Sequence, residues 1–383
     1  MAGLSVDAFN RIVDLGILTP HDGDVFTDGQ ARGAEFVASL EAAGLSLDDM
    51  AVLFRSRAMS LDFMERPEYS VFTGLSDVTF AELAARSGVP VSILMLIREA
   101  GGAAQPGPDD RVRQGELAVV PFLEYQVNAG FPQIAIERLL RAYGDSLRRM
   151  AESEAEWWRA GVIAPLTAAG KSGAELMDVE PPPAVDDSVI ALWHAHRARA
   201  WTGNIVESIE GLLAEAGLGH ALRRPPAMCF LDIAGYTRLT AEQGDAAAAS
   251  LAERLGRLVH RVSASHGGKP VKWLGDGVLL YFRDPGSGVV AALDMVDLVV
   301  EAGLPPAHVG LHAGPVVFQQ GDYYGQTVNV ASRIAEYARP GEVLVSQAVV
   351  DAADGVAATF REIGPVELRG VASMVTLHAA IRS

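Results

Sequence analysis

The pattern of apolar and polar positions divides the chain into two halves of different kinds. The first half repeats apolar residues at helical spacing, as in Glu35–Ala43 and Leu117–Ala129, and a glycine follows each stretch. The second half alternates short apolar runs such as Ala227–Gly235 with amphipathic stretches such as Asp245–Gly267. Within it, HVGLHAGPVVFQQG (His308–Gly321) is expected to form a pair of strands, and a helix that starts near Thr327 places residues 329 and 333 on one face. We therefore expect an all-α first part, followed by an α/β sandwich with a mixed sheet and helices over it.

A gapless internal repeat organises the first half. When the chain is shifted by 86 residues, Gly16–Gly29 lies over Gly102–Gly115. The second copy is preceded by two short amphipathic helices within Thr79–Gly101, joined through Ser87-Gly88-Val89, which is a helix-turn-helix pattern. Together with the turn and the long helix after it, this segment resembles the DNA-binding module of MerR-type regulators. We expect residues 1–170 to form a helical regulatory domain built from two such modules.

A break and a long helix separate the two halves. Three consecutive prolines at 181–183 cannot continue a helix, so we predict a hinge there. The acidic start of the next segment can cap a helix over 187–216. The apolar face of that helix suits either a transducer or coiled-coil seam, or simple packing on the next domain. The predicted boundaries are 171–221 for the hinge and connecting helix and 222–383 for the second domain.

Composition narrows the classes of function. The chain has 383 residues, a net charge of −17 and one cysteine, Cys229. A single cysteine rules out an internal disulfide framework and fits a reducing cytoplasm. Its place inside an apolar strand predicts a small buried hydrophobe and not a nucleophile. No apolar run approaches the ~20 residues of a transmembrane helix. The negative charge disfavours nucleic acid as a partner, and a polyanionic nucleotide would need metal ions or a local basic pocket.

The balance of charges also argues against DNA reading by the helix-turn-helix segment. From Met1 to Met150 there are 13 arginines, no lysine and 21 acids, which gives 13 − 21 = −8. The candidate recognition helix offers only Arg98, and the turn after it offers Arg111 and Arg113. A sensing or dimerising scaffold is therefore favoured over an operator reader.

The second half carries candidate catalytic residues at strand ends. Asp232 ends an apolar strand, and Asp276 lies in the turn of a predicted hairpin around Gly275-Asp276-Gly277. Carboxylates that converge from strand ends are the oxygen ligands that Mg²⁺ prefers, and two of them could hold a metal pair. Lys272 enters the same turn, although Lys171, Lys269 and Lys272 are the only lysines among 31 basic residues. Such a lysine suggests a place for a compact point charge.

The motifs FLDIAGYT, VKWLGDGVLLYF, GLHAGPVV, GDYYGQTVNVASRI, PGEVLVS and LRGV occur in this order over roughly 150 residues. The set, about Met228–Arg382, resembles the catalytic domain of class III nucleotidyl cyclases. The resemblance implies a ferredoxin-like α+β domain whose active sites lie at the interface of a homodimer. It also implies two Mg²⁺ or Mn²⁺ ions per site, held by the carboxylates of Asp232 and Asp276 with the carbonyl of Ile233 as a neighbouring ligand.

The same resemblance implies five further contacts to the nucleotide. Lys272 and Asp322 would read the purine, and Asn329 would orient the ribose. Arg333 would stabilise the transition state. Arg369, in LRGV, would contact the terminal phosphates, where the family more often has lysine.

The chemistry of the purine pair predicts the substrate. Adenine offers N1 as an acceptor and N6 as a donor, which suits Lys272, a donor, and ionised Asp322, an acceptor. Guanine presents the reverse pattern, and unmatched buried polar groups discriminate strongly. We therefore expect an adenylate cyclase acting on ATP, with a guanylate cyclase as the alternative. The alternative from another functional class is a DNA-binding regulator whose cyclase-like domain only senses nucleotide.

The expected enzyme is cytoplasmic and homodimeric, through the cyclase domain and the N-terminal half. Protons, a lipid or other small apolar ligand, and a protein partner are the signals open to that half. His194 and His196 on the connecting helix make pH sensing conceivable.

Overall fold

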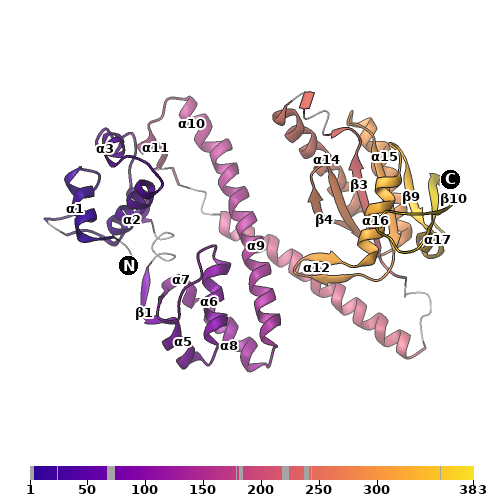
Figure 1. The fold of residues 1–383 in the computed structure, drawn as a ribbon, viewed down its shortest axis with the longest axis horizontal. Coiled ribbons are helices and arrows are strands. Elements are labelled where there is room, and N and C mark those ends of the chain that lie inside the picture. Colours follow the sequence, from indigo (N-terminus) through magenta and orange to yellow (C-terminus); the bar gives the residue numbers. More distant parts are fainter. Residues whose placement is uncertain are drawn as a thin grey trace. The chain divides into compact units, whose positions relative to one another are not determined.

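Two units of different architecture make up the part of the chain that the computed structural model describes (Figure 1). They span Met1–Leu192 and Trp193–Ser383. The prolines at 181–183 and the predicted boundary at 221/222 lie outside the described residues. The described residues are 4–23, 25–66, 74–177, 179–180, 184–217, 224–236, 241–242, 244–353 and 355–383.

Helices form most of the first unit, as the sequence predicts. One feature that the sequence did not indicate is a short antiparallel pair, β1 (Leu75–Thr79) with β2 (Arg111–Arg113). A 3₁₀ turn (Asp62–Glu65) and a π turn (Arg159–Ile163) are also present. The helices are α1 (Val6–Asp14), α2 (Asp28–Ala42), α3 (Leu47–Arg55), α5 (Phe80–Ser87), α6 (Val91–Ala100), α7 (Gln114–Leu117), α8 (Val120–Asn128), α9 (Gln133–Trp158), α10 (Ala164–Ala168) and α11 (Gly173–Met177).

Local capping chemistry decides where these helices begin. Thr27 and Gln30 form a capping box, so the helix predicted from Glu35 begins earlier, at Asp28. The helix predicted over Leu117–Ala129 is divided instead into α7 and α8, and a proline occupies the first turn of α8.

The first unit follows the 86-residue offset seen in the sequence. Helix α3 begins at Leu47 and helix α9 at Gln133, a difference of 86. Gly44 and Gly130, also 86 apart, follow the preceding helices with φ of +100° and +75°, the left-handed conformation that glycine adopts readily. Each copy encloses its own apolar cluster.

Arg98 is the one cation of the candidate recognition helix α6, and its side chain is bound by other residues of the first unit. Its Nε and Nη2 donate to the two carboxylate oxygens of Glu116 at 2.7 and 2.9 Å, and both side chains are only 10% exposed. Nη2 also donates to the carbonyl of Arg111 at 2.8 Å. A guanidinium held in this way cannot contact a DNA phosphate without breaking a buried ion pair. The geometry thus favours a scaffold over an operator reader.

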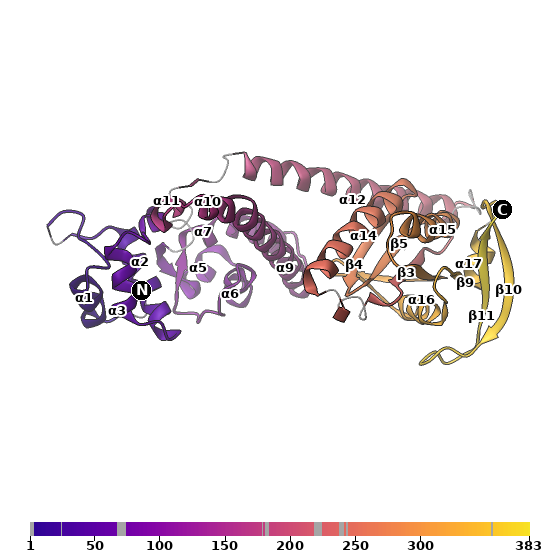
Figure 2. The ribbon, with the colours of Figure 1, turned by 90° about the horizontal axis from the view of Figure 1, so that it is seen from above.

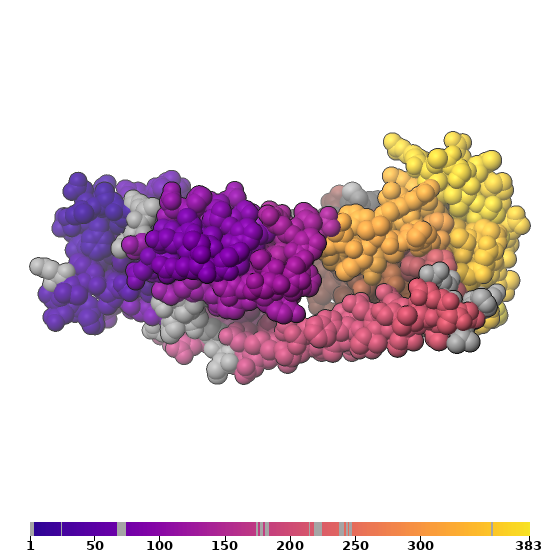
Figure 3. Space-filling model, turned by 90° about the horizontal axis from the view of Figure 1, so that it is seen from below, coloured from indigo at the N-terminus to yellow at the C-terminus, as the bar shows by residue number. Residues whose placement is uncertain are grey.

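The long helix predicted over 187–216 is confirmed as α12 (Val185–Glu215), which spans the boundary between the units. Arg197 stacks over Trp193 and Trp201, with its guanidinium 4.2 and 5.3 Å from the ring centroids, and so continues the apolar stripe. The surface of this helix is visible as a ridge in Figure 3. Within the described residues, no helix has both the length and the apolar character needed to span a bilayer. The exposed apolar side chains of α12 are Ile190, Leu192, Trp193, Trp201, Ile205, Ile209 and Leu212.

A seven-stranded mixed sheet is the centre of the second unit, as predicted. The strand order is β10-β11-β9-β6-β3-β5-β4. Every neighbouring pair is antiparallel except β6 with β9. The strands are β3 (Ala227–Ile233), β4 (Gly268–Leu274), β5 (Gly277–Phe282), β6 (Ala307–Ala313), β9 (Val343–Ser346), β10 (Ala358–Val366) and β11 (Val375–Arg382).

Helices cover both faces of this sheet (Figure 2). Helices α14 (Asp245–Ser265), α15 (Pro285–Glu301) and α17 (Gln347–Ala352) lie on one face, and α16 (Gln326–Tyr337) lies on the other. Cys229 points into the core on the α15 side, as the sequence predicts for a small hydrophobe, and burial raises the pKa of its thiol. Because side chains alternate along a strand, Asp232 shares the opposite face with Met228.

One predicted pairing is wrong. The segments HVGLHAG and PVVFQQG were expected to pair with each other, but β6 pairs with β3 and β9. The second segment instead contributes β7 (Val317–Gln319), which pairs with β8 (Asp322–Tyr324) as a separate small hairpin. The local alternation of residues predicts a strand but does not specify its partner.

Helix α16 lies unusually close to the sheet at Gly310. A Cβ placed on Gly310 would lie 2.1 Å from the backbone nitrogen of Ala335 and 2.7 Å from the carbonyl oxygen of Ala331. Backbone atoms cannot yield as a flexible side chain can. Glycine therefore allows the close packing of β6 against the helix that carries Asn329 and Arg333.

We predict that Gly310→Ala destabilises the second unit by about 2–3 kcal/mol, because β6 and α16 must separate. The midpoint of thermal unfolding, followed by circular dichroism, measures this loss. Gly211→Ala is the control, since a Cβ there meets no atom within 4 Å. That change replaces a helical glycine in α12 and should be neutral or stabilising by up to about 1 kcal/mol. Equal melting of Gly310→Ala and wild type would contradict the prediction.

Candidate active site

The β4–β5 hairpin carries two of the predicted site residues. Its loop is Gly275-Asp276, and Gly275 has φ of +68°, so the predicted tight turn is confirmed. Lys272 lies on β4, just after a register shift between Pro270 and Lys272. A short hairpin therefore holds Lys272 and Asp276 at one end of the sheet.

Asp232 lies beside this hairpin because β3 pairs with β5. Asp232 is opposite Gly277 in the antiparallel register, and a Cβ on Gly277 would come within 3.2 Å of its Oδ1. Burial and then the charge of Asp276 raise the pKa of Asp232. His308 and the backbone N–H of Ile233 oppose that rise. The carboxylates of Asp232 and Asp276 therefore repel each other. Gly277, which has no side chain, leaves space beside them.

This donor set fits a hard divalent cation. Asp232 and Asp276 offer carboxylate oxygens, and a cation between them would relieve their repulsion. Among the described residues, no group of three or more His, Cys, Asp or Glu side chains could hold a metal ion. The two carboxylates would therefore need further oxygen ligands, such as the predicted Ile233 carbonyl, water and substrate phosphate.

Lys272 and Asp322 form a direct ion pair. Lys272 Nζ donates to Asp322 Oδ2 at 2.5 Å, although the two residues are 50 positions apart. The other carboxylate oxygen, Oδ1, accepts the backbone N–H of Tyr323 at 2.8 Å. Both partners are partly exposed, so the pair is accessible and its carboxylate is already oriented.

Asn329 and Arg333 lie on α16, one turn apart, as predicted. Asn329 is exposed. Arg333 forms an ion pair with Glu336, which raises the pKa of its guanidinium. Arg369 is exposed in the turn between β10 and β11, and no hydrogen bond or ion pair between described residues joins it to the others. The structure thus groups Asp232 with Asp276 and Lys272 with Asp322.

His308 is a neighbour of the site that the sequence did not reveal. It lies opposite Asp232 in the β3–β6 register, with its Nε2 3.5 Å from Asp232 Oδ2. Its Nδ1 lies 2.9 Å from the carbonyl oxygen of Ala335 on α16, and only a protonated Nδ1 can donate there. His308 therefore connects the carboxylate to the helix that carries Arg333. Only knowledge of the strand pairing could have identified it.

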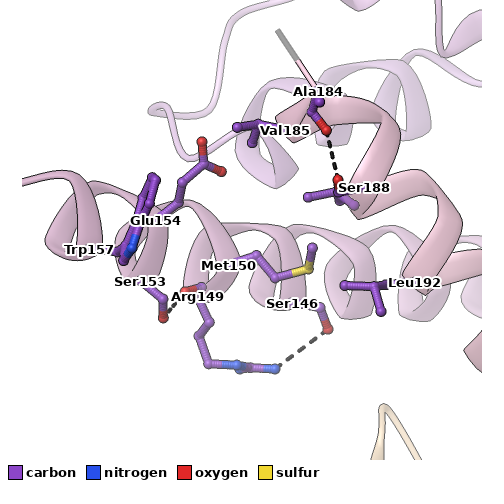
Figure 4. A pocket seen from close by; sticks show the side chains of 11 residues that line it. Ser146, Arg149, Met150, Ser153, Glu154, Trp157, Ala184, Val185, Ser188 and Leu192 are labelled. Atoms are coloured by element: carbon purple, nitrogen blue, oxygen red, sulfur yellow. Dashed lines mark hydrogen bonds between the residues drawn. The ribbon is translucent and has the colours of Figure 1, made fainter. Parts of the chain in front are cut away.

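A groove of about 840 Å³ lies within the first unit, between α9 and the start of α12 (Figure 4). Met150, Trp157 and Leu192 contribute apolar surface, and Arg149 and Glu154 are also in its lining. None of the predicted site residues lines it.

The known proteins to which this chain is similar include several cyclases. Residues 225–379 match the family model described as the adenylate and guanylate cyclase catalytic domain. An adenylate cyclase of Streptomyces coelicolor is 27% identical over 277 residues, 70% of this chain and 70% of that protein. A pH-sensitive adenylate cyclase of Mycobacterium tuberculosis is 27% identical over 383 residues, 94% of this chain and 90% of that protein. Among solved structures, the adenylyl cyclase CyaB from P. aeruginosa matches 42% of this chain and 95% of its own, with 22% identity and a TM-score of 0.38.

We predict that Mn²⁺ stabilises the second unit through the two carboxylates. At ten times its dissociation constant, Mn²⁺ should raise the unfolding temperature by about 3 °C. Asp232→Asn and Asp276→Asn should each lose most of this shift, because each removes a charged ligand. Glu301→Gln, which alters an exposed carboxylate at the end of α15, is the control. Equal shifts in all variants would contradict the assignment.

Proposed function

We propose that the chain, whose residues 225–379 form a class III adenylyl/guanylyl cyclase catalytic domain, is an adenylate cyclase. It converts ATP to 3′,5′-cyclic AMP and pyrophosphate. The choice of ATP over GTP rests on the ion pair between Lys272 and Asp322, in which Nζ and Oδ2 are 2.5 Å apart. An ammonium that only donates, next to a carboxylate that only accepts, matches adenine N1 and N6 and mismatches guanine.

Different residues of this chain have different roles in the proposed reaction. The ribose 3′-oxygen attacks the α-phosphorus, the bond to the β-phosphate oxygen breaks, and pyrophosphate leaves. Asn329 orients the ribose for this attack. Arg333, released from Glu336, stabilises the negative charge that grows on the transferring phosphoryl group. Arg369 contacts the terminal phosphates. Its exposed position in a turn leaves it free to reach a polyanion.

Two Mg²⁺ or Mn²⁺ ions are the cofactors. Asp232 and Asp276 would hold them, with the Ile233 carbonyl as a neighbouring ligand. Bound there, the metal pair would lower the pKa of the 3′-hydroxyl and neutralise phosphate charge.

The enzyme acts as a homodimer through its cyclase domains, with the N-terminal half as a second interface. The carboxylates of one protomer face the purine pair of its partner. One chain carries every required residue type, so a two-fold dimer has two complete sites. The separate grouping of the two carboxylates and of the Lys272–Asp322 pair supports this division.

We predict that wild-type protein with Mn²⁺ prefers ATP to GTP by at least about 100-fold in kcat/KM, because guanine leaves both members of the pair unmatched. Asp322→Ala should reduce this preference by tenfold or more, through the loss of the acceptor. Chromatography of cyclic AMP and cyclic GMP measures both rates. Lys171→Ala, in the first unit, is the control. Faster turnover of GTP would favour the guanylate cyclase alternative. No turnover of either nucleotide, with Asp232→Ala and wild type alike, would refute the cyclase.

The first unit regulates this activity through α12. Residues 1–170 form the regulatory domain of two MerR-like modules, 171–221 the linker and 222–383 the catalytic domain, in a cytoplasmic enzyme. The ion pair between Glu210 on α12 and Arg283, which follows β5, supports this route because it ties the helix to the catalytic sheet. Protons are the first signal to test, since a relative that matches 94% of this chain is named for pH sensitivity.

We predict that the full chain and a 222–383 fragment differ in their pH profiles. The ratio of their rates should change by about threefold or more between pH 5.5 and 8, the range in which histidine is the usual side chain to change its charge. Cyclic AMP formation at saturating ATP measures both proteins. The fragment with Asp232→Ala supplies the background rate. Equal rates at every pH would refute regulation by the first unit.

A further inference from the structure

Lys269 is a charged residue of the catalytic unit to which the reaction assigns no part. It is one of three lysines in the chain and lies on β4, three residues before Lys272. Its Nζ lies 5.5 Å from the ring centroid of Tyr281, 5.6 Å from that of Phe318 and 5.4 Å from that of Tyr323. All three distances are within the range of a cation–π contact.

The three rings also contact one another. Tyr281 on β5 stacks on Tyr323 on β8, with centroids 4.7 Å apart and ring planes inclined by 14°. Phe318 on β7 lies 5.0 Å from Tyr323 at a tilted angle. Lys269 therefore sits where the main sheet meets the β7–β8 hairpin. We call these three rings and the ammonium the Lys269 cluster.

The cluster reaches the purine pair through the backbone. Tyr323, a member of the cluster, donates its N–H to Asp322 Oδ1 at 2.8 Å. Lys272, on the same strand as Lys269, donates to Asp322 Oδ2 at 2.5 Å. One oxygen of the Asp322 carboxylate is thus held by a member of the cluster, and the other by a residue on the strand that carries Lys269.

The hairpin that bears Asp322 depends on such contacts. Its strands β7 and β8 have three residues each and pair only with each other, and a two-stranded hairpin is marginal on its own. Phe318 is 60% exposed, whereas Tyr323 is 9% exposed. Phe318 and Tyr323 are opposite each other in the register and so share one face of the hairpin. This face meets the sheet through the buried Tyr323, which stacks on Tyr281, and the ammonium of Lys269 lies near all three rings.

We propose that Lys269 is a positioning residue for purine recognition: it fastens the β7–β8 hairpin to β4 and so holds Asp322 where it can pair with Lys272. Lys269 contacts no substrate and acts through Tyr323. The inference rests on the proposed adenylate cyclase function, since it concerns the selection of adenine. Removal of its charge should weaken selection of the base more than it slows the chemical step.

Helix α12 is the other neighbour of the cluster. Burial lowers the pKa of Lys269 overall and is the largest cause of the raised pKa values of Tyr281 and Tyr323. The negative charge of Glu207 on α12 acts in the upward direction on all three groups. The carboxylate thus favours the charged form of the lysine that the cluster requires. It also places the connecting helix within electrostatic reach of the residues that hold the purine pair.

The test compares Lys269→Met, which removes the charge and keeps most of the chain length, with Lys269→Arg, which keeps the charge. Lys269→Met should lower the ratio of kcat/KM for ATP to that for GTP by about threefold to tenfold, mainly through a higher KM for ATP. Its kcat for ATP should stay within about twofold of wild type. Lys269→Arg should restore the ratio to within about twofold, because a guanidinium also binds aromatic faces. Lys171→Met should leave the ratio unchanged.

Hydrogen exchange supplies a readout that does not depend on turnover. Amides of residues 317–324 should exchange faster in Lys269→Met than in wild type, Lys269→Arg or Lys171→Met. An unchanged nucleotide ratio, or an equal loss of kcat for ATP and GTP, would overturn the assignment. If the hairpin amides exchanged at the same rate in all four proteins, the positioning role of Lys269 would be refuted. This result does not depend on turnover, whereas a wild-type protein that made no cyclic nucleotide would refute the proposed function.

Discussion

The antiparallel pairing of β3 with β5 is the contact on which the candidate site depends. It sets Asp232 opposite Gly277 and so beside Asp276, in a place where glycine leaves room for a carboxylate. Burial and then the neighbouring charge of Asp276 raise the pKa of Asp232, so the two carboxylates resist being ionised together. A divalent cation bound between the two carboxylates would relieve this repulsion, which is the role that the proposed function gives to the metal.

The remaining parts of the site are attached to this sheet by close contacts of different kinds. Helix α16 approaches β6 so closely that only glycine fits at Gly310, and His308 contacts both Asp232 and the helix. The β7–β8 hairpin, in contrast, is fastened by side chains: the Lys269 cluster and the Lys272–Asp322 pair. Backbone packing makes the helix rigid, whereas the hairpin can respond to its neighbours, among them α12. In the proposed enzyme, selection of the substrate would thus be the step most open to regulation.

The first unit offers little for DNA to bind, although part of its sequence resembles a DNA-binding module. Its helix-turn-helix segment has one cation on α6, and that cation is buried against Glu116. With a charge balance of −8 over the first 150 residues, no compensating basic surface is expected there. The exposed apolar stripe of α12 begins in this unit and continues past Arg197 in the second, and it suits contacts between proteins better than contacts with a polyanion.

The sequence by itself determined the features that depend on neighbouring residues. The glycine-bearing turn at Gly275-Asp276, the helix that bears Asn329 and Arg333, and the alternation of strands and helices all follow from local periodicity and turn chemistry. The ordered motifs, through the family resemblance, added the expected roles of the site residues.

Only the tertiary structure decided which distant residues meet. His308 lies 308 − 232 = 76 positions from Asp232, and β7 pairs with β8 and not with β6. Arg98 and Glu116 are 18 positions apart, Lys272 and Asp322 are 50 apart, and only the second pairing was expected, through the family resemblance. Strand partners and ion pairs are selected by packing across the sheet. Contacts of that range leave no periodic signal along the chain.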